Sequence, residues 1–393
     1  MLNNQENKTL SIAMLGHKVV PSRRGGIELV LTTIAPLLVS HGYDVTCFNR
    51  AGDEVENEYI GTVKEEKYKG VKLITVPAIK KRGLSAVTAS VFAALRAALG
   101  NYDVVHFHAE GPCAMIWLPK ILGKKCVVTV HGLDWQRDKW HGGLGAKYIL
   151  FGERCLAKYA DSIIVLSQGV QDYFREKYGR TIIMIPNGVE KPVHREPKLI
   201  KEKYGLNGRD YILLLSRLTA EKGVHYLIEA YQQLQKTNST LGKKLVIAGA
   251  ESDTYDYLEK LQKMANGNLN IIFTGFVSGA VLDELYSNAY IHCIPSNLEG
   301  MPLGLLEAMS YGNAVLGSDI PEIADVVEDK AVLFNHGNVD DLREKLQMLL
   351  DCPSKVEKLR RESADFILAK YNWQEVARAT EHIYRQVTAK LRS

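Results

Sequence analysis

Short runs of β-branched and other apolar residues alternate with helix-compatible segments along most of the chain. Before residue 190 the predicted strands are SIAMLG, YDVTCFNR, VKLITVPA, YDVVHFHA, KCVVTVHG, DSIIVLS and TIIMIPNG. After residue 210 they are YILLLS, KLVIAGA, NIIFTGF, YIHCIPS, NAVLGSD and AVLFN. Such alternation is typical of βαβ units and parallel sheets. The pattern therefore predicts an α/β fold with two doubly wound, Rossmann-like domains.

A polar segment separates the two sets of strands. Residues 190–210 are highly charged and contain two prolines and two glycines, which indicates an interdomain connection. After residue 349 the pattern is helical, and the last stretch is predicted to cross back onto the first domain. We predict an N-terminal domain over 1–190, a C-terminal domain over 191–373 and a returning helix over 374–393. A ligand is expected in a central cleft between the carboxyl-end loops of both sheets.

Composition narrows the class of protein. The chain has 393 residues, of which 46% are hydrophobic and 24% charged, as in ordinary soluble globular proteins with room for two domains. A formal charge of +4 is too small to indicate nucleic-acid binding. The six cysteines are scattered without a C-x-x-C pair, which favours reduced core residues in a cytoplasmic protein.

Membrane association is expected to be peripheral at most. The polar N-terminal segment does not read as a signal peptide, and no run of 18 apolar residues predicts a membrane span. In segment 79–99, however, Lys80, Lys81 and Arg82 precede an apolar, alanine-rich helix. This pattern fits contact with an anionic membrane surface, on the inner face of the plasma membrane. A buried helix with a solvated basic first turn is the alternative.

The stretch SNLEGMPLGLLEAMSYG holds two glutamates, Glu299 and Glu307, on either side of a break at Pro302. In one unbroken helix their side chains would be about 80° apart around the axis and roughly 12 Å apart along it, too far to share a proton. Since proline favours the first turn, we predict that the helix begins near Pro302. Glu299 then lies in the preceding loop, and an anion can bind the helix N-terminus between the glutamates. Alternatively, both are ordinary solvated acids.

Each domain begins with a loop suited to an anion. In the first, Gly25 and Gly26 open a helix and let backbone N–H groups approach a ligand closely. This is not the G-x-G-x-x-G fingerprint, and the second strand ends in CFNR without the acidic residue that binds an NAD ribose, so a dehydrogenase is not favoured. In the second domain, Arg217 and Lys222 follow the first strand and could hold a diphosphate, or be solvated surface residues.

Together these motifs resemble family 4 glycosyltransferases of the GT-B fold over essentially the whole chain. The resemblance is carried, in order, by RRGGIE, VTVHG, IPNGV, SRLTAEKG and NLEGMPLGLLEAM, the last fitting the family's Glu-x7-Glu motif. HKVVPSRRGGIE and HGLDWQRDKW are similar to bacterial transferases of surface polysaccharide assembly, including rhamnosyltransferases. The resemblance implies an acceptor-side first domain and a donor-binding second domain.

For the donor, the resemblance implies that Glu299 contacts sugar hydroxyls and Glu307 contacts the ribose. Arg217 and Lys222 would bind the diphosphate with the help of backbone N–H groups at the helix start. Gly26 would approach the same phosphates from the first domain, and the GFVS segment would flank the base. The remaining implied donor-binding residues are Gly25, Phe276, Val277, Gly300, Met301, Pro302, Leu303 and Gly304.

At the reaction centre, the resemblance implies that His131 lies by the donor sugar, so that His131 and Glu299 are the candidate catalytic residues. The loop GLDWQRDKW is the candidate acceptor side, where Asp134 and Arg137 could meet hydroxyls or phosphate and Trp135 or Trp140 could stack on a sugar. A packed surface loop is the alternative interpretation.

The resemblance further implies retention of anomeric configuration through front-face attack. We expect neither a cofactor nor a metal, because the sequence has no D-x-D motif of the kind that holds a catalytic metal. A three-histidine metal site of His106, His108 and His131 is a geometric alternative, which the absence of an acidic partner disfavours.

The leading hypothesis is a retaining transferase that moves a hexose of rhamnose or glucose type from a nucleotide-diphosphate sugar. The acceptor would be an oligosaccharide or polyprenyl-diphosphate-linked saccharide of a bacterial surface polysaccharide. A transferase-like nucleotide-binding protein without activity is the alternative, and an NADP-linked oxidoreductase is a third.

Overall fold

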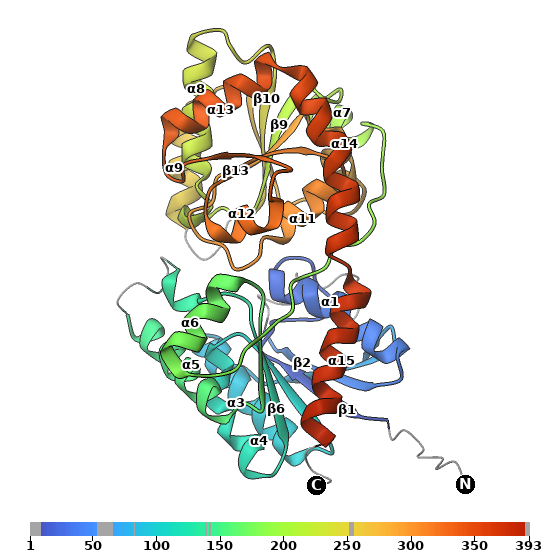
Figure 1. The fold of residues 1–393 in the computed structure, drawn as a ribbon. Helices are drawn as coiled ribbons and strands as arrows, with labels where there is room; N and C mark the ends of the chain where they lie inside the picture. Colours follow the sequence, from blue (N-terminus) through green and yellow to red (C-terminus); the bar gives the residue numbers. More distant parts are fainter. Residues whose placement is uncertain are drawn as a thin grey trace, which may run out of the picture. The chain divides into compact units, whose positions relative to one another are not determined.

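The computed structural model describes residues 9–52, 66–81, 83–137, 140, 143–250 and 255–389. Internal contacts divide the chain into two compact units, each described here by itself (Figure 1). The first unit comprises the chain up to Gln136, residues 140–187 and the segment from Trp373, and Arg137 groups with residues 188–372 in the second. The chain thus changes unit after Asn187 and Asn372, where the sequence predicted boundaries at 190 and 373.

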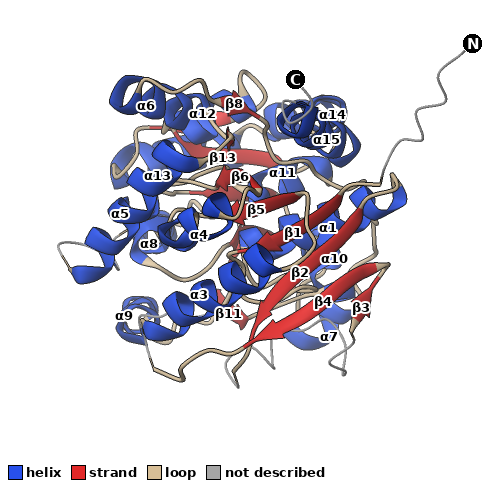
Figure 2. Cartoon of the chain, turned by 90° about the horizontal axis from the view of Figure 1, so that it is seen from below, coloured by secondary structure: helices blue, strands red, loops and turns tan. Residues whose placement is uncertain are grey.

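The described part of the first unit contains an eight-stranded sheet in the order β3-β4-β2-β1-β5-β6-β7-β8 (Figure 2). Its neighbours pair in parallel except β3 and β4, which are antiparallel. The strands are β1 (Ser11–Leu15), β2 (Asp44–Arg50), β3 (Lys67–Tyr68), β4 (Val71–Val76), β5 (Val104–His108), β6 (Lys125–Val130), β7 (Ser162–Val165) and β8 (Ile183–Met184).

Helices cover both faces of this sheet, because alternate strand residues point to opposite sides. On one face Ala13, Leu15 and Phe107 pack with residues of α3, α5 and α6. On the other, α1 packs against α15, which also contacts β6. The helices of the unit are α1 (Gly26–Ser40), α3 (Leu84–Leu99), η1 (Gly111–Met115), α4 (Trp117–Ile121), η2 (Asp134–Gln136), α5 (Leu144–Tyr159), α6 (Gln168–Tyr178) and α15 (Trp373–Ala389).

The second unit contains a six-stranded parallel sheet among its described residues, in the order β11-β10-β9-β12-β13-β14. This is a doubly wound order, because the chain reverses direction across the sheet between β9 and β12. The strands are β9 (Tyr211–Leu215), β10 (Lys244–Ala248), β11 (Ile271–Gly275), β12 (Ile291–Ile294), β13 (Ala314–Ser318) and β14 (Val332–Phe334).

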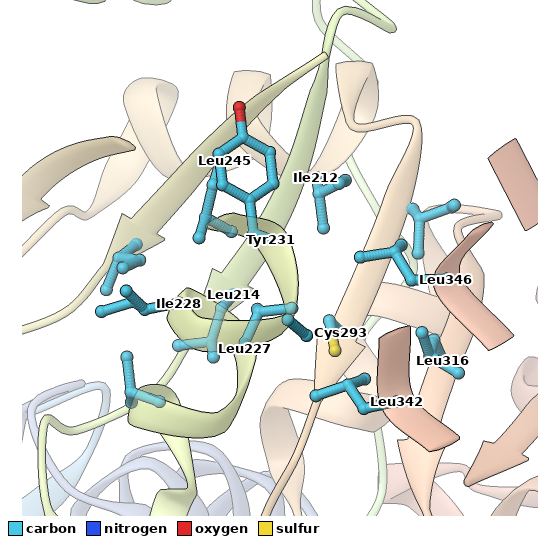
Figure 3. Close-up of a cluster of buried hydrophobic side chains, with 14 of the residues drawn as sticks. Ile212, Leu214, Leu227, Ile228, Tyr231, Leu245, Cys293, Leu316, Leu342 and Leu346 are labelled. Atoms are coloured by element: carbon cyan, nitrogen blue, oxygen red, sulfur yellow. The ribbon is translucent and has the colours of Figure 1, made fainter. Parts of the chain in front are cut away.

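Two apolar clusters bury the faces of this second sheet. Ile212, Leu214 and Leu245 pack with α8 and α13 on one face (Figure 3). Leu213 and Val246 pack with α10 and α11 on the other. The helices of the unit are α7 (Leu199–Tyr204), η4 (Ala220–Lys222), α8 (Val224–Lys236), α9 (Tyr255–Ala265), α10 (Gly279–Asn288), α11 (Leu303–Ser310), α12 (Pro321–Val327), α13 (Val339–Asp351) and α14 (Pro353–Lys370).

The prediction of two parallel, Rossmann-like sheets is confirmed, and every strand predicted from the sequence is found. The pattern missed β3, whose two residues are too few to show an apolar period. All six cysteine thiols are free, and only Cys352 is not buried. Within the described ranges, the helices are too short or too polar to cross a bilayer.

Candidate active site

The N-terminus of α11 lies at the carboxyl end of β9. Pro302 is its N-cap, and the N–H groups of Leu305 and Leu306 already donate to the Pro302 carbonyl oxygen. The N–H groups of Leu303 and Gly304, in the first turn, have no acceptor within the helix, which makes this end attractive to an anion. A Cβ at Gly304 would lie 3.4 Å from the Leu215 oxygen, so the small residue lets the helix start close to β9.

Lys222 and Glu299 form an ion pair in the same region. The Lys222 Nζ lies 2.6 Å from Glu299 Oε1, and the two side chains are only 13% and 9% exposed. The Ser296 hydroxyl donates to the same oxygen over 2.7 Å. Burial lowers the pKa of Lys222, and the nearby Arg217 lowers it further, whereas Glu299 acts to raise it. The structure therefore pairs Lys222 with Glu299, and Arg217 lies near enough to Lys222 to affect its pKa.

Hydrogen bonds and a close backbone approach fix the two loops on which Lys222 and Glu299 lie. The Asn297 N–H donates to the Glu221 oxygen over 2.8 Å, and the Asn297 side-chain amide donates to the Tyr226 hydroxyl over 3.1 Å. Gly223 has a φ of 64°, and a Cβ there would lie 1.9 Å from the Pro295 oxygen. Only glycine fits this conformation and this close approach. The loop after β9 and the loop after β12 are thus held against each other.

Glu307 has different surroundings from Glu299. It lies on α11, and its Oε2 accepts a hydrogen bond of 3.2 Å from the Tyr286 hydroxyl. Tyr286 is almost fully buried and stacks on Tyr311 with ring centroids 5.2 Å apart. The loop position of Glu299 and the helical position of Glu307 agree with the geometry expected from Pro302.

The other predicted donor residues lie on neighbouring loops of the second unit. Gly300 and Met301 connect Glu299 to α11, and Met301 is buried. Phe276 follows β11 and is 41% exposed, while Val277 packs against the cluster around α10. These positions are at the carboxyl ends of β11 and β12, where an open α/β sheet binds ligands.

The glycine pair of the first unit has a more acidic environment than expected. Helix α1 begins at Gly26, and a Cβ at Gly25 would lie 1.9 Å from Glu28 Oε2. The other oxygen of Glu28 accepts the Lys18 N–H over 2.8 Å. A side chain at position 25 would therefore displace the Glu28 carboxylate from its present position. A negative side chain in the first turn already complements this helix end, which reduces its attraction for a phosphate.

His131 is the last of a row of three neighbouring histidines at the carboxyl ends of β5 and β6. His131 Nε2 and His108 Nδ1 are 3.1 Å apart, and the rings of His108 and His106 lie 4.2 Å apart. His106 Nδ1 contacts the Tyr384 hydroxyl over 2.6 Å, and its Nε2 contacts the Thr129 hydroxyl over 2.8 Å. Burial lowers the pKa of His106 to about 3 and the pKa of His108 well below its ordinary value. Both imidazoles are therefore neutral near pH 7.

The three-histidine alternative gains no support from this geometry. Both nitrogens of His106 are already engaged by hydroxyl groups. Among the residues that the structure describes, no group of three or more His, Cys, Asp or Glu side chains is arranged to hold a metal ion.

Two residues of the predicted acceptor loop are hydrogen-bonded to buried carboxyl groups of the first unit. The Asp134 N–H donates to Glu110 Oε2 over 2.7 Å, and the Trp135 indole N–H donates to Glu153 Oε2 over 3.0 Å. Arg137, by contrast, groups with the second unit. The structure therefore brings Asp134 and Trp135 together in one turn, which Arg137 follows.

The tryptophans of this loop contact other residues of the protein. The Trp135 ring centroid lies 6.3 Å from that of Tyr173, and a Cβ at Gly145 would lie 2.3 Å from the Trp140 ring. Such contacts fix the orientation of both rings, as the alternative interpretation of a packed loop expects.

Sequence reasoning missed the buried partners of these site residues. Glu110, two residues after the HFH pair, could have been noticed as a carboxylate at the end of a buried strand. Glu153 and Tyr384 lie in the middle of helices, where no local pattern distinguishes them from ordinary core or surface positions.

Comparison with known proteins places this geometry in a family. Residues 24–191 match the family described as Glycosyltransferase Family 4, and residues 197–366 match the family described as Glycosyl transferases group 1. The chain belongs to glycosyltransferase family 4. The transferase class expected from the motifs is thereby confirmed, and each family match falls largely within one of the two units.

Relatives and solved structures extend this family 4 assignment. An α-D-kanosaminyltransferase of Streptomyces kanamyceticus is 25% identical over 72% of this chain and 77% of its own length. An uncharacterised glycosyltransferase of Methanocaldococcus jannaschii is also 25% identical, over 96% of this chain and 98% of its own. The Anabaena protein HepE, solved with UDP and glucose, matches with a TM-score of 0.78 and 16% identity over 96% of this chain and 100% of its own. The fold is therefore GT-B.

Proposed function

We propose that this glycosyltransferase moves a hexose, of rhamnose or glucose type, from a nucleotide-diphosphate sugar with retention of anomeric configuration. The proposed acceptor is an oligosaccharide or polyprenyl-diphosphate-linked saccharide in the assembly of a bacterial surface polysaccharide. The solved structure of HepE contains UDP and glucose, which supports a nucleotide-linked hexose as the donor class.

The observation that carries the donor proposal is the Lys222–Glu299 ion pair beside the start of α11. Lys222 and Arg217 supply positive charge for a diphosphate, and the first N–H groups of α11 add hydrogen-bond donors. Glu299 adds an acceptor for sugar hydroxyls. We assign the ribose to Glu307 and the base to Phe276 and Val277.

The proposed reaction is a front-face displacement. The bond between the anomeric carbon and the leaving phosphate oxygen breaks while the acceptor oxygen bonds to the same face of that carbon. The proton of the acceptor hydroxyl passes to the leaving phosphate oxygen. The protein then mainly has to stabilise charge on the diphosphate, which Arg217, Lys222 and the α11 N-terminus are suited to do. We further propose that His131 contacts the sugar and that the reaction needs no metal.

A panel of nucleotide sugars tests this proposal. We expect one or two of them to release nucleotide slowly without acceptor, and faster with a saccharide acceptor, equally in the presence of a chelator. Tight binding of nucleoside diphosphate without turnover of any donor would instead favour the inactive transferase-like protein. Product whose anomeric configuration is inverted would contradict the retaining mechanism.

A second part of the proposal is contact with an anionic membrane through segment 79–99. Helix α3 buries small side chains, including Ala93 and Ala97, while its large apolar side chains are exposed. The α4 helix, which packs against α3, exposes Trp117 and Ile121 as well. Lys80 and Lys81 precede α3, and Arg82 lies outside the described residues. The exposed large apolar residues of α3 are Leu84, Phe92, Leu95 and Leu99.

An apolar helix face next to basic residues suits an interfacial helix rather than the buried helix of the alternative interpretation. Sedimentation with vesicles tests it. The protein should bind vesicles that contain anionic lipid more than neutral vesicles, and the double variant Phe92→Ser/Leu99→Ser should lose this binding. The matched control is Leu241→Ser/Leu269→Ser, which changes exposed leucines of the second unit. Equal losses in both double variants would contradict a specific membrane face.

A further inference from the structure

Two buried carboxyl groups support the loop that follows His131. Glu110 follows β5, and Glu153 lies in the middle of α5. Neither side chain is exposed to solvent. Buried carboxyl groups are costly unless they are hydrogen-bonded, so their partners indicate what they do.

The first partners are two successive residues of η2. Glu110 Oε2 accepts the backbone N–H of Asp134 over 2.7 Å. Glu153 Oε2 accepts the indole N–H of Trp135 over 3.0 Å. The backbone of the turn and one of its side chains are thus each held by a carboxyl group.

The second oxygen of Glu153 is bound by three side chains of α6. Its Oε1 accepts hydrogen bonds of 2.9 Å from the Tyr173 hydroxyl, 2.8 Å from Lys177 Nζ and 2.5 Å from the Tyr178 hydroxyl. Burial acts to raise the pKa of Glu153, but these hydrogen bonds outweigh it and lower the pKa. Glu153 is therefore the charged member of the pair.

Glu110 is in the opposite protonation state. Burial, together with the charges of Asp134 and Glu153, raises the pKa of Glu110 well above its ordinary value. In the described part of the chain, its Oε1 has no hydrogen-bond partner. A raised pKa favours the protonated form, so Glu110 is the neutral member of the pair.

We propose that Glu110 and Glu153 are positioning residues for glycosyl transfer, which hold the turn of Asp134 and Trp135 in the geometry that receives the hydroxyl-bearing acceptor. The proposal rests on the proposed function, in which this turn is the acceptor side. Under this proposal, Glu110 and Glu153 determine how well the acceptor binds although neither residue contacts it. A buried carboxyl pair is weak evidence for stability, because desolvation offsets the attraction, so we expect its loss to change the turn more than the whole unit.

Two substitutions of similar length at position 110 separate hydrogen bonding from packing. In Glu110→Gln the amide oxygen can still accept the Asp134 N–H. In Glu110→Met that bond cannot form. Tyr148→Phe is the matched control, because it removes a buried hydroxyl without a hydrogen-bond partner among the described residues of the same unit.

The first measurement is hydrogen exchange at the Asp134 amide in the full chain. We expect wild type, Glu110→Gln and Tyr148→Phe to be protected alike, and Glu110→Met to exchange about tenfold faster or more. The second is steady-state kinetics with the best donor. Glu110→Met should raise the KM for acceptor on the order of tenfold while the KM for donor stays unchanged, and Glu110→Gln should restore the wild-type value.

A second variant keeps the test valid if Glu110→Met does not fold. Lys177 is 40% exposed, so Lys177→Met removes a partner of Glu153 without opening the core. It should raise the KM for acceptor several-fold with an unchanged KM for donor. Faster exchange of Asp134 without any change in the KM for acceptor would overturn the positioning role. So would a Glu110→Met variant that matches wild type in both measurements.

Failure of the proposed function gives a different result. If wild type transfers no sugar from any nucleotide donor, the proposed function fails and the positioning role fails with it, whatever the exchange data show. If wild type transfers sugar but Glu110→Gln and Glu110→Met have the same KM for acceptor, only the positioning role fails.

Discussion

Lys222 of the second unit and His106 of the first are both buried polar side chains, but their surroundings favour opposite charge states. Lys222 has a carboxylate at 2.6 Å, which stabilises its charge although burial lowers its pKa. His106 is hydrogen-bonded to the hydroxyls of Tyr384 and Thr129, and burial lowers its pKa to about 3, so it is neutral. The loops at the strand ends of the second unit thus hold a charged pair, whereas His106 of the first unit belongs to a neutral hydrogen-bonded group.

This difference matches the chemistry proposed for each unit. A diphosphate is held by charge, which Arg217, Lys222 and a helix N-terminus provide. A sugar hydroxyl is recognised by neutral donors and acceptors in fixed positions, such as those that end at His131. We therefore expect nucleotide binding to depend on charge in the second unit, and the group around His106 to depend on neutral hydrogen bonds.

The largest effect is expected for Arg217→Ala. Loss of two charge-assisted hydrogen bonds to a diphosphate should weaken the binding of nucleoside diphosphate about 100-fold. Calorimetric titration measures it, with Arg343→Ala on α13 as the control for an equal change of charge in the same unit. Equal affinities of the two variants would show that Arg217 does not hold the phosphates.

Glu299→Gln should separate turnover from nucleotide affinity. The variant loses the charged acceptor for sugar hydroxyls, so turnover should fall roughly 30-fold. The affinity for nucleoside diphosphate should change less than about threefold, because the ligand itself can replace the carboxylate as the partner of Lys222.

Glu307→Gln is the matched comparison for the second glutamate. It should weaken nucleoside diphosphate binding more than Glu299→Gln does, because Glu307 is assigned to the ribose. If the two variants show the reverse order in the same titrations, the roles of the glutamates are exchanged.

The pH dependence of nucleotide binding tests the charge of Lys222 directly. In the proposed site the protonated form of Lys222 binds the diphosphate, and the pKa of Lys222 is lowered from 10.5 chiefly by burial. Affinity should therefore fall as pH rises, by about tenfold once Lys222 has lost its proton. The fall should begin at a lower pH than an ordinary lysine would give.

Lys222→Arg is the control, since arginine keeps its charge throughout this range. Its nucleotide affinity should stay flat where that of the wild type falls. An identical pH profile for both proteins would assign the titration to another group.

The sequence predicted the fold well, for a physical reason. Strands buried on both faces, such as β9, are continuous apolar runs. The polar stretch after Val189 separates the two sets of strands. Local chemistry also predicted that Glu299 lies in a loop and Glu307 in a helix, because proline at position 302 fixes where α11 begins. The two-residue strand β3 left no such pattern.

The first-unit site could not be predicted in the same way. His106 contacts Tyr384 across 278 residues of sequence, and Glu153 reaches the acceptor turn from the middle of a helix. No local sequence pattern predicts which buried polar groups form hydrogen bonds with each other, because these contacts depend on how helices pack against the sheet. Their protonation states depend on the same burial, so they too become visible only in the structure.

The smallest effect, and the one that tests the neutral network, is expected for Tyr384→Phe. The variant removes the hydroxyl bonded to His106, which should cost about 1 kcal/mol of unfolding free energy. Tyr148→Phe also removes a buried hydroxyl of the first unit, but one without a partner among the described residues, so it should cost much less.

How the loss of unfolding free energy in Tyr384→Phe changes with pH decides whether His106 is neutral in the folded protein. Because folding lowers its pKa to about 3, the unfolded chain binds the proton first, and wild-type stability should fall as pH drops below 6.5. Tyr384→Phe should show the same fall, so that the difference between the two proteins stays constant from pH 8 to pH 5. Thermal unfolding measures this difference as a shift of roughly 2–4 °C. A difference that grows or vanishes near pH 6.5 would mean that folded His106 takes up a proton there, and the contrast with the charged second unit would be lost.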